Sequence, residues 1–392
     1  MRLNSLSAFL IVLVLFSSSA IGSNTPEEKW SKSFGGPGLD VGFSVLEASD
    51  GGYVVAGFSE SDACLIKTDS NGNEVWNRTF GGPEFDEAYS VQQTVDGGYV
   101  VAGSTDYTIW LVKTDSEGNE IWNKTFGESK SYGSNSVQQT RDGGYIIVGR
   151  TEYDDILLIK TDSDGNEIWN RTFGGENFDY GESVRQTEDG GYIIVGYTNS
   201  YGVGEDDENI WLIKTDPNGY EEWDRTFGGV GYADEGYSVQ QTNDGGYIIT
   251  GQIHHYEAGN WDVDAWLIKT DSNGIETWNR TFSGISDEWG SGPYSDWGND
   301  VQQAEDGGYV VAGITRHDPP RSSEIWLIKT DSKGNLEWDW KSGGSRVVYA
   351  ESLHQTSDGG YILAGSVQTR DLTSDWDSWH RAGDDIFLIK LI

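Results

Sequence analysis

A phrase built around Asp-Gly-Gly-Tyr recurs seven times along this chain of 392 residues. "SVQQTVDGGYVVAG", which starts at Ser90, is one full copy. The Asp that opens each core is Asp50, Asp96, Asp142, Asp189, Asp244, Asp306 or Asp358. Self-similarity at a period of about 20–50 residues marks a repeat architecture, in which one unit cannot bury its apolar face alone. The chain must therefore fold as an array of similar units.

Each repeat contains four short segments that have the composition of strands. In the second copy they are "YSVQQT", "GGYVVAGST", "IWLVKTD" and "NEIWNKTF". They are rich in β-branched and aromatic residues and are bounded by Gly, Asn and Asp. The middle two are apolar on both faces and need cover on both sides. The fourth alternates, with Trp76, Arg78 and Phe80 on one face, which is typical of a half-exposed strand.

A four-stranded unit with buried inner strands and a partly solvent-exposed outer strand is typical of a propeller blade. The segment from Glu27 to Gly36 is of the fourth type with no blade before it, and the segment from Asp384 to Ile392 is of the third type with no fourth after it. We therefore predict an all-β, seven-bladed β-propeller of four-stranded antiparallel blades, in which the N-terminal strand completes the last blade and closes the ring. The predicted blades span approximately 41–82, 87–126, 133–173, 180–227, 235–282, 298–341, and 349–392 with 27–35.

The first residues, "MRLNSLSAFLIVLVLFSSSAIGS", have the pattern of a secretory signal peptide. We predict a signal peptide over 1–22, cleaved after Ala20 or Gly22, and a single propeller domain over 23–392. An uncleaved anchor is the alternative. The apolar run is short for a membrane span and no second run follows, so no transmembrane segment is expected after cleavage. The predicted location is secreted, extracellular or at the cell surface.

Charge and cysteine content narrow the function classes. The formal net charge is −38, from 64 acidic and 26 basic residues, which disfavours nucleic acid and anionic membranes as partners. The single cysteine, Cys64, excludes an intramolecular disulfide framework. It occupies the position that Trp110 and Trp211 fill in other repeats, so we interpret it as a core residue.

The units "WNRTFGGPEFDEAYSVQQTVDGGYVVAGST" and "WLVKTDSEGNEIW" resemble the β-propeller repeats of secreted bacterial and archaeal surface proteins. They resemble more distantly the quinoprotein-like propellers, whose Trp-docking motif joins an Asp-turn-Gly hairpin to a Trp. Here the step from Asp69 to Trp76 is seven residues, one shorter than in that motif. The resemblance covers the chain from Glu27 onward. It implies export and a binding or structural role rather than a reaction.

If the strands are lettered A to D from axis to rim, the A–B and C–D turns keep one length in every repeat. The B–C and D–A connections vary, mainly in blades 4–7. In an antiparallel blade these two connections lie on the same face of the disc. Insertions confined to one face of a repeat protein commonly mark its binding surface. We refer to this face as the variable face.

The insertions carry aromatic residues and histidines outside the repeated positions. Trp and Tyr rings there are candidates for stacking on a glycan or peptide, or alternatively for packing on one another. The histidines, with acids such as Asp262 and Asp264, are candidate transition-metal ligands, although no pair has a zinc-site spacing. The candidate ligand-binding residues are Trp261, Trp289, Trp297, Trp376, Trp379, Tyr256, Tyr294, His254, His255, His317 and His380.

One repeat position before strand A is acidic in most blades. It is filled by Asp40, Asp86, Asp179, Asp234 and Asp296. These carboxylates are expected at the channel rim, where they are candidate ligands for a divalent cation such as Ca²⁺. The alternative is that each Asp caps backbone N–H groups of its own Gly-Gly turn. No other cofactor is predicted, since "TDSNGNE" has its glycine at the wrong place for a calcium loop and is a hairpin turn.

Asn-X-Thr glycosylation acceptors recur on the fourth strands, at Asn77, Asn123, Asn170 and Asn279. The alternative is a strand sequence that matches the acceptor pattern by chance.

The predicted function is a non-enzymatic propeller that binds a ligand, glycan or protein partner through the long B–C and D–A connections of blades 4–7. The chain has no Gly-X-Ser-X-Gly elbow, His-Glu-X-X-His motif or phosphate-binding loop. One alternative is a structural surface or envelope module. Another is a carbohydrate-active hydrolase or lyase that uses loop carboxylates.

Overall fold

The computed structural model describes residues 19–21, 25–36, 38–83, 85–127, 133–202, 204, 207–229, 233–257, 260–284, 295–317, 322–343, 346–368 and 384–392. Every regular element in these ranges is a β-strand. A helix long and apolar enough to span a membrane is not found among them.

The strands form antiparallel blades of four, paired in chain order. Blade 1 comprises β3 (Asp40–Glu47), β4 (Tyr53–Ser59), β5 (Asp62–Thr68) and β6 (Glu74–Phe80). Blade 2 comprises β7 (Asp86–Gln93), β8 (Tyr99–Thr105), β9 (Thr108–Thr114) and β10 (Glu120–Phe126). Blade 3 comprises β11 (Ser134–Gln139), β12 (Tyr145–Arg150), β13 (Ile156–Thr161) and β14 (Glu167–Phe173). Blade 4 comprises β15 (Asp179–Gln186), β16 (Tyr192–Thr198), β17 (Asn209–Thr215) and β18 (Glu221–Phe227).

Blades 5 and 6 belong to one nine-stranded sheet. Blade 5 comprises β19 (Glu235–Gln241), β20 (Tyr247–Glu257), β21 (Asn260–Thr270) and β22 (Glu276–Phe282). Blade 6 comprises β23 (Ser295–Gln303), β24 (Tyr309–His317), β25 (Ser322–Thr330) and β26 (Leu336–Gly343). A single parallel pairing of Val263 with Ser295 joins them. The ninth strand, β1 (Ser19–Ile21), lies within the predicted signal peptide and pairs antiparallel with β26.

Blade 7 combines the two ends of the chain. It comprises β27 (Val348–Gln355), β28 (Tyr361–Gln368), β29 (Asp384–Leu391) and β2 (Glu28–Phe34), in the order β2-β29-β28-β27. The pairing of β2 with β29 is antiparallel, with Glu28 opposite Leu391 and Phe34 opposite Ile386. The predicted exchange of the N-terminal strand is thus present as a pairing in the structure.

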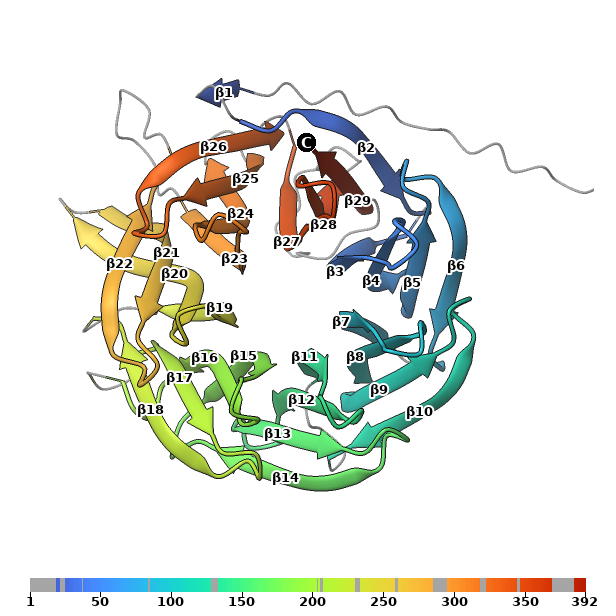
Figure 1. The fold of residues 1–392 in the computed structure, drawn as a ribbon, viewed down its shortest axis with the longest axis horizontal. Helices are drawn as coiled ribbons and strands as arrows, with labels where there is room; N and C mark the ends of the chain where they lie inside the picture. The colour runs from blue at the N-terminus through green and yellow to red at the C-terminus, as the bar shows by residue number, and fades with distance from the viewer. Residues whose placement is uncertain are drawn as a thin grey trace, which may run out of the picture.

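The blades are arranged around a common centre, with the first strand of each blade innermost and the last at the rim (Figure 1). Strands β3, β7, β11, β15, β19, β23 and β27 face the centre. The outer strands alternate as predicted: in β6, Trp76 and Arg78 are half-buried, while Val75, Asn77 and Thr79 are exposed. The prediction of an all-β chain built from four-stranded antiparallel blades is therefore confirmed.

The repeated Ser-Val-Gln-Gln sequence ties neighbouring innermost strands together. The Val91 amide donates to Ser44 Oγ of the preceding blade at 3.3 Å, and the Gln139 amide donates to Gln92 Oε1. The second Gln reaches the A–B turn of the preceding blade, since the Ser49 amide donates to Gln93 Oε1 at 2.8 Å. Equivalent bonds recur between other blades, so the repetition of this phrase supplies similar joints between similar units.

The Asp of each Asp-Gly-Gly turn holds the buried Lys of strand C. Lys113 Nζ lies 3.0 Å from an oxygen of Asp96 and also donates to the Thr114 carbonyl, so its buried charge is paired. The Gly98 amide donates to the same Asp. All seven turns have this ion pair at 2.8–3.0 Å: Lys67–Asp50, Lys113–Asp96, Lys160–Asp142, Lys214–Asp189, Lys269–Asp244, Lys329–Asp306 and Lys390–Asp358.

Each outer-strand Trp packs against the next blade. Trp76 lies with its ring centroid 6.0 Å from that of Tyr99, the Tyr of the next Asp-Gly-Gly-Tyr core. Beside it, Gly118 adopts φ +76° in the C–D turn, and a Cβ there would meet the Trp76 ring at 2.7 Å. The same Trp–Tyr contact recurs at 5.7–6.0 Å in the pairs Trp30–Tyr53, Trp122–Tyr145, Trp169–Tyr192, Trp223–Tyr247, Trp278–Tyr309 and Trp338–Tyr361.

The described parts of the B–C insertions of blades 5 and 6 extend strands, which differs from the loops expected from the sequence. β20 and β21 are each 11 residues long and continue their pairing out to Glu257 and Asn260. β24 and β25 continue to His317 and Ser322. Extra length in a connection between two paired strands can be absorbed by extending the ladder, because each added pair satisfies its own backbone groups.

Candidate functional site

Every innermost strand contains a β-bulge at one repeat position. In blade 2 the pairing skips from Ala88 to Ser90, so Tyr89 has no partner on β8. A bulge bends the strand and re-aims the side chain of the extra residue. The skipped residues in the blades are Phe43, Tyr89, Asn135, Glu182, Tyr237, Asn299 and Glu351. We call these seven residues the bulge ring.

The bulge ring lines a cavity of about 450 Å³. Gln252 of β20, Trp297 of β23 and Tyr349 of β27 complete its lining. Because every innermost strand contributes to it, the cavity lies at the axis of the molecule, and we call it the axial cavity. The ring residues stand at or before the middle of their strands, ahead of the repeated glutamines that lead to the A–B turns. The axial cavity therefore lies on the D–A side of these glutamines, which is the side of the variable face.

The bulge ring repeats every three blades. After Phe43 in blade 1, the residues in blades 2–4 are Tyr89, Asn135 and Glu182, and those in blades 5–7 are again Tyr, Asn and Glu. The residue two places before each ring Tyr also matches, as Glu87 and Glu235. The flanking residues of strand A serve joints that recur in most blades. The residues of the bulge ring therefore repeat every three blades, whereas the scaffold residues beside them repeat in nearly every blade.

The matching residues make matching hydrogen bonds. Asn135 Nδ2 donates to Glu182 Oε2 at 3.0 Å and to the Gly181 carbonyl at 3.1 Å. Asn299 Nδ2 donates to Glu351 Oε2 at 3.5 Å and to the Ala350 carbonyl at 2.8 Å. The ring Tyr of blades 2 and 5 donates to the Glu two residues before it, from Tyr89 to Glu87 and from Tyr237 to Glu235. Each half of the ring therefore orients its carboxylates in the same way.

Burial dominates the electrostatics of the two ring glutamates. Burial raises the pKa of Glu182 to about 7, with a further rise from Glu235 and an opposing effect of Arg150. Burial alone raises the pKa of Glu351 to about 7. Because the cost of ionising a carboxyl group in this environment is high, both groups gain from a cation or hydrogen-bond donor in the cavity.

A second pocket of about 320 Å³ lies at the other end of the innermost strands. It is lined by Arg185, Asp300 and several of the repeated glutamines. Arg185 Nη1 donates to Ser136 Oγ at 3.2 Å and to the Val184 carbonyl at 2.9 Å. The Asp300 carboxylate accepts from Ser238 Oγ and from the Leu353 amide. These polar groups serve the joints between blades, so this pocket belongs to the scaffold.

Trp297 is the predicted ligand-binding tryptophan that the structure brings to the axial cavity. It lies on innermost strand β23 rather than in a loop, opposite Ile314 of β24. It also packs against the core between blades 6 and 7. Both the stacking and the packing interpretations of this residue are therefore compatible with its position.

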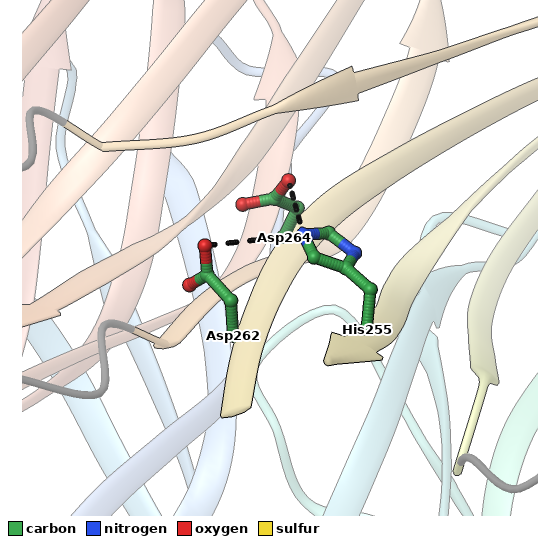
Figure 2. Close-up of side chains that lie close together, drawn as sticks. All are labelled: His255, Asp262 and Asp264. Atoms are coloured by element: carbon green, nitrogen blue, oxygen red, sulfur yellow. Dashed lines mark ion pairs between the residues drawn. The ribbon is translucent and has the colours of Figure 1, made fainter. Parts of the chain in front are cut away.

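His255 meets two acids on the β20–β21 hairpin (Figure 2). Its Nε2 atom lies 3.3 Å from Asp264 Oδ2 and 3.8 Å from Asp262 Oδ2. One ligand atom from each of the three residues falls within 4.8 Å of the others. These are N and O donors that a divalent cation accepts, and they also form an ion pair across the hairpin when His255 is protonated. His254 is separate, with its amide donating to Asp234 Oδ1 at 2.8 Å, and burial lowers its pKa.

Several predicted residues fall elsewhere. Trp289, Tyr294, Trp376, Trp379 and His380 lie outside the described residues. Tyr256, Trp261 and His317 are described by backbone only, on β20, β21 and β24.

The five repeated Asp residues are fully buried and do not line the axial cavity among the residues described. Asp179 Oδ2 accepts from the Gly175 amide at 2.9 Å and from Ser200 Oγ at 2.7 Å, and its Oδ1 accepts from Thr198 Oγ1. The amides that donate to the equivalent Asp in the other blades are Gly36, Gly82, Gly229 and Gly284. These hydrogen bonds fit the capping alternative, in which each carboxylate accepts from the backbone of its own turn, and the cation site at the channel rim stays a prediction.

The four glycosylation acceptors lie on the outer strands β6, β10, β14 and β22, as predicted. Asn77, Asn123 and Asn170 are exposed, and Asn279 is half-buried. Three of the side chains donate to the Glu three residues earlier, as Asn123 does to Glu120 at 2.6 Å.

Sequence reasoning missed the bulge ring. It grouped Tyr89 with the constant segment "YSVQQT", although the residue before Ser is Phe, Asn, Glu or Tyr in other copies. The signal was present as a variable column directly beside constant columns. A bulge adds one residue without changing the apolar pattern on either side, so periodicity does not reveal it.

Comparison with solved structures identifies the architecture. The WD40 domain of Neurospora crassa Pan2 superposes with a TM-score of 0.57 at 11% identity, covering 94% of this chain and 96% of that one. YCF48 bound to D1 peptide superposes with a TM-score of 0.53 at 11% identity, covering 94% and 97%. The chain is a β-propeller. At this identity the likeness concerns the fold alone.

A family model described as outer membrane protein assembly factor BamB matches residues 19–171 of the propeller. This match, over part of the chain, supports the quinoprotein-like character that the Asp-turn-Gly and Trp pattern suggested. A search of curated proteins gave no match.

Proposed function

We propose that this protein is a secreted or cell-surface, non-enzymatic β-propeller that binds a ligand in the axial cavity. In this proposal the propeller has seven blades and is closed by β2 as the outer strand of blade 7. The extended B–C hairpins of blades 5 and 6 belong to the variable face, and Gln252 of β20 lines the cavity. The apolar N-terminal segment and the resemblance to exported surface repeats support the location.

The bulge ring is the observation that carries the proposal. A packed scaffold needs the Ser, Val and Gln residues of strand A, which form the joints between blades. It has no use for a separate polar and aromatic pattern at the bulge position. A volume of about 450 Å³ is in the range of small-ligand sites, which combine aromatic surface with a few placed polar groups.

The ligand can be a free small molecule or a group that a partner protein inserts. The propeller YCF48 was solved bound to a peptide, which supports a polypeptide partner for a scaffold of this fold. Aromatic rings and amide groups suit a glycan as well. The proposed site is the axial cavity, and its ligand is a peptide group, a glycan or another small molecule.

The test compares glycan-array and peptide-array binding by the mature protein and two variants. The double variant Tyr89→Ala/Tyr237→Ala removes two rings from the axial cavity. The control Tyr153→Ala removes an exposed ring from the B–C turn of blade 3, on the variable face. We expect binding to be lost in the double variant and retained in the control, with both folded by circular dichroism.

Equal binding by a folded double variant would overturn the axial site. Binding lost in the control alone would move the site to the outer part of the variable face. Cleavage of an arrayed glycan would support the carbohydrate-active alternative instead of the non-enzymatic one. Absence of any binding to either array would favour the structural surface-module alternative.

A further inference from the structure

The axial cavity combines aromatic walls with acidic groups. Five of its ten lining residues are aromatic: Phe43, Tyr89, Tyr237, Trp297 and Tyr349. Two others, Glu182 and Glu351, are carboxylic acids, and the remaining three carry side-chain amides. None of these ten carries a positive charge. Rings and carboxylates around one space are the surroundings that bind an organic ammonium group, through cation–π contact and charge-assisted hydrogen bonds.

The two ring glutamates stand on different sides of the axis. Glu182 belongs to blade 4 and Glu351 to blade 7, which are separated by two intervening blades in one direction and by three in the other (Figure 1). Each is held by the Asn of the preceding blade. The cavity therefore presents two similarly oriented acceptors to a ligand that lies across it.

We propose that the axial cavity binds a ligand with two alkylammonium groups, one directed to Glu182 and the other to Glu351, with the chain between them packed on the aromatic rings. This rests on the proposed function, since it names the ligand chemistry of that same site. The source is a free diamine or a pair of lysine side chains presented by a partner.

The charges around the two glutamates are consistent with a cationic ligand. Glu182 interacts with Glu235 and with Arg150, and Arg150 is already engaged, with Asp154 at 3.2 Å and the ring of Tyr180 at 4.6 Å. Burial raises the pKa of Tyr349, the charge of Arg316 lowers it, and the charges of Asp384 and Glu351 raise it. Arg150 lines an adjoining pocket that also contacts Tyr89, Asn135 and Glu182. Neither arginine is among the residues that line the axial cavity, which presents acidic, amide and aromatic groups to the ligand.

The test measures the affinity of four probes by calorimetry at pH 8 and low ionic strength. The probes are 1,4-diaminobutane, butylamine, 1,4-butanediol and a short peptide with two lysines. We expect 1,4-diaminobutane to bind at least about tenfold more tightly than butylamine, and the neutral diol to show no binding. Affinity should fall as the pH is lowered through about 7, where the two carboxyl groups take up protons.

The variants Glu182→Gln and Glu351→Gln preserve shape and remove one negative charge each. Each substitution should lower the affinity for 1,4-diaminobutane at least about tenfold. It should also reduce the ratio of the affinity for 1,4-diaminobutane to that for butylamine. The control Glu117→Gln changes an exposed acid in a C–D turn and should leave affinity unchanged apart from a small salt-sensitive effect. Tight binding of the peptide together with weak binding of 1,4-diaminobutane would show that the two ammonium groups come from lysines of a partner protein.

Two results would overturn the inference. One is binding of the diol as tight as that of the diamine, and the other is unchanged affinity in both Glu→Gln variants. The proposed function fails separately, if Tyr89→Ala/Tyr237→Ala retains every interaction found on the arrays. A glycan that binds in the cavity and is lost in that double variant, with no amine binding, would leave the proposed function standing and remove this inference.

Discussion

Asn135 donates a hydrogen bond from Nδ2 to Glu182 Oε2 across the boundary between blades 3 and 4, at 3.0 Å. The same pair recurs as Asn299 and Glu351 between blades 6 and 7. In each pair an amide of one blade orients a half-buried acid of the next, which couples the geometry of the axial cavity to the joints between blades.

The half-buried ring glutamates should make stability depend on pH near neutrality. The folded-state pKa of Glu351 is about 7, above its ordinary value of 4.5, so the folded protein binds the proton more tightly than the unfolded chain. The free energy of unfolding should therefore fall as the pH rises from about 4.5 to about 7. The Glu351→Gln variant should have the same free energy of unfolding as the wild type near pH 4. At pH 8 its free energy of unfolding should be higher than that of the wild type, by at most about 3 kcal/mol. Denaturant titrations at both values test this, and an equal effect at both would contradict it.

The turn ion pairs should act in the opposite direction at low pH. Although partial burial raises it, hydrogen bonds from Thr94 and Lys113 lower the pKa of Asp96 to about 2. This depressed pKa contributes stability above about pH 4 that is lost as the pH falls toward 2. Because Asp96 is more than half exposed, Asp96→Asn should cost only about 1 kcal/mol at pH 7 and nothing near pH 2. Asp164→Asn, an exposed turn substitution, is the control in the same denaturant series.

Contacts between an outer-strand Trp and the next blade should carry much of the adhesion between blades. Trp76→Ala removes a ring that packs on Tyr99 and over Gly118, and should cost about 3 kcal/mol. Val75→Ala changes the adjacent residue on the exposed face of β6 and should stay within about 0.5 kcal/mol. Similar losses in the two variants, measured as unfolding free energies, would show that the Trp contact is not a principal joint.

Chelation should leave the scaffold unchanged. Asp179 is already occupied by the Gly175 amide and by two hydroxyl groups of its own blade. Treatment with EDTA should therefore leave the Tm unaltered, whereas Asp179→Ala should lower stability by about 2–4 kcal/mol with or without calcium. A calcium-dependent rise in Tm that disappears in Asp179→Ala would instead establish the predicted divalent site.

Cys64 should report opening of the seam between blades 7 and 1. It is 1% exposed in a core cluster that joins β5 to Ile386 and Leu388 of β29, and burial raises the pKa of its thiol to about 12. A thiol reagent should react slowly with the native protein. Trp30→Ala in β2 weakens this seam and should accelerate labelling, whereas Trp122→Ala, between blades 2 and 3, should do so less. Equal acceleration would mean that labelling follows global unfolding.

The sequence predicts the blades well because their determinants are local. Turn glycines such as Gly118, the alternation around Trp76 and the doubly apolar inner strands each follow from a short segment. The extended hairpins are not predicted from the sequence, because the insertion around His255 mixes polar and aromatic residues and so conceals the strand pattern.

The candidate site was less accessible from the sequence. Trp297 was recognised as unusual but assigned to a loop, since its place on strand A depends on where the D–A insertion ends. The bulge ring depends on a single extra residue per strand, and the meeting of Asn135 with Glu182 depends on the closure of neighbouring blades. Such relationships become visible only when the repeats are aligned column by column and arranged around one axis.

The pairing of β2 with β29 also sets an order of events in time. Glu28 is translated long before its partner Leu391, so β2 emerges while the strand it will pair with does not yet exist. Until then β2 and the outer edge of blade 7 are open to wrong partners, including strands of a second nascent chain. If translation stops before Asp384, the product lacks β29 and cannot form this pairing. The pairing therefore reports that translation has passed through β29, because only a chain translated that far can form it.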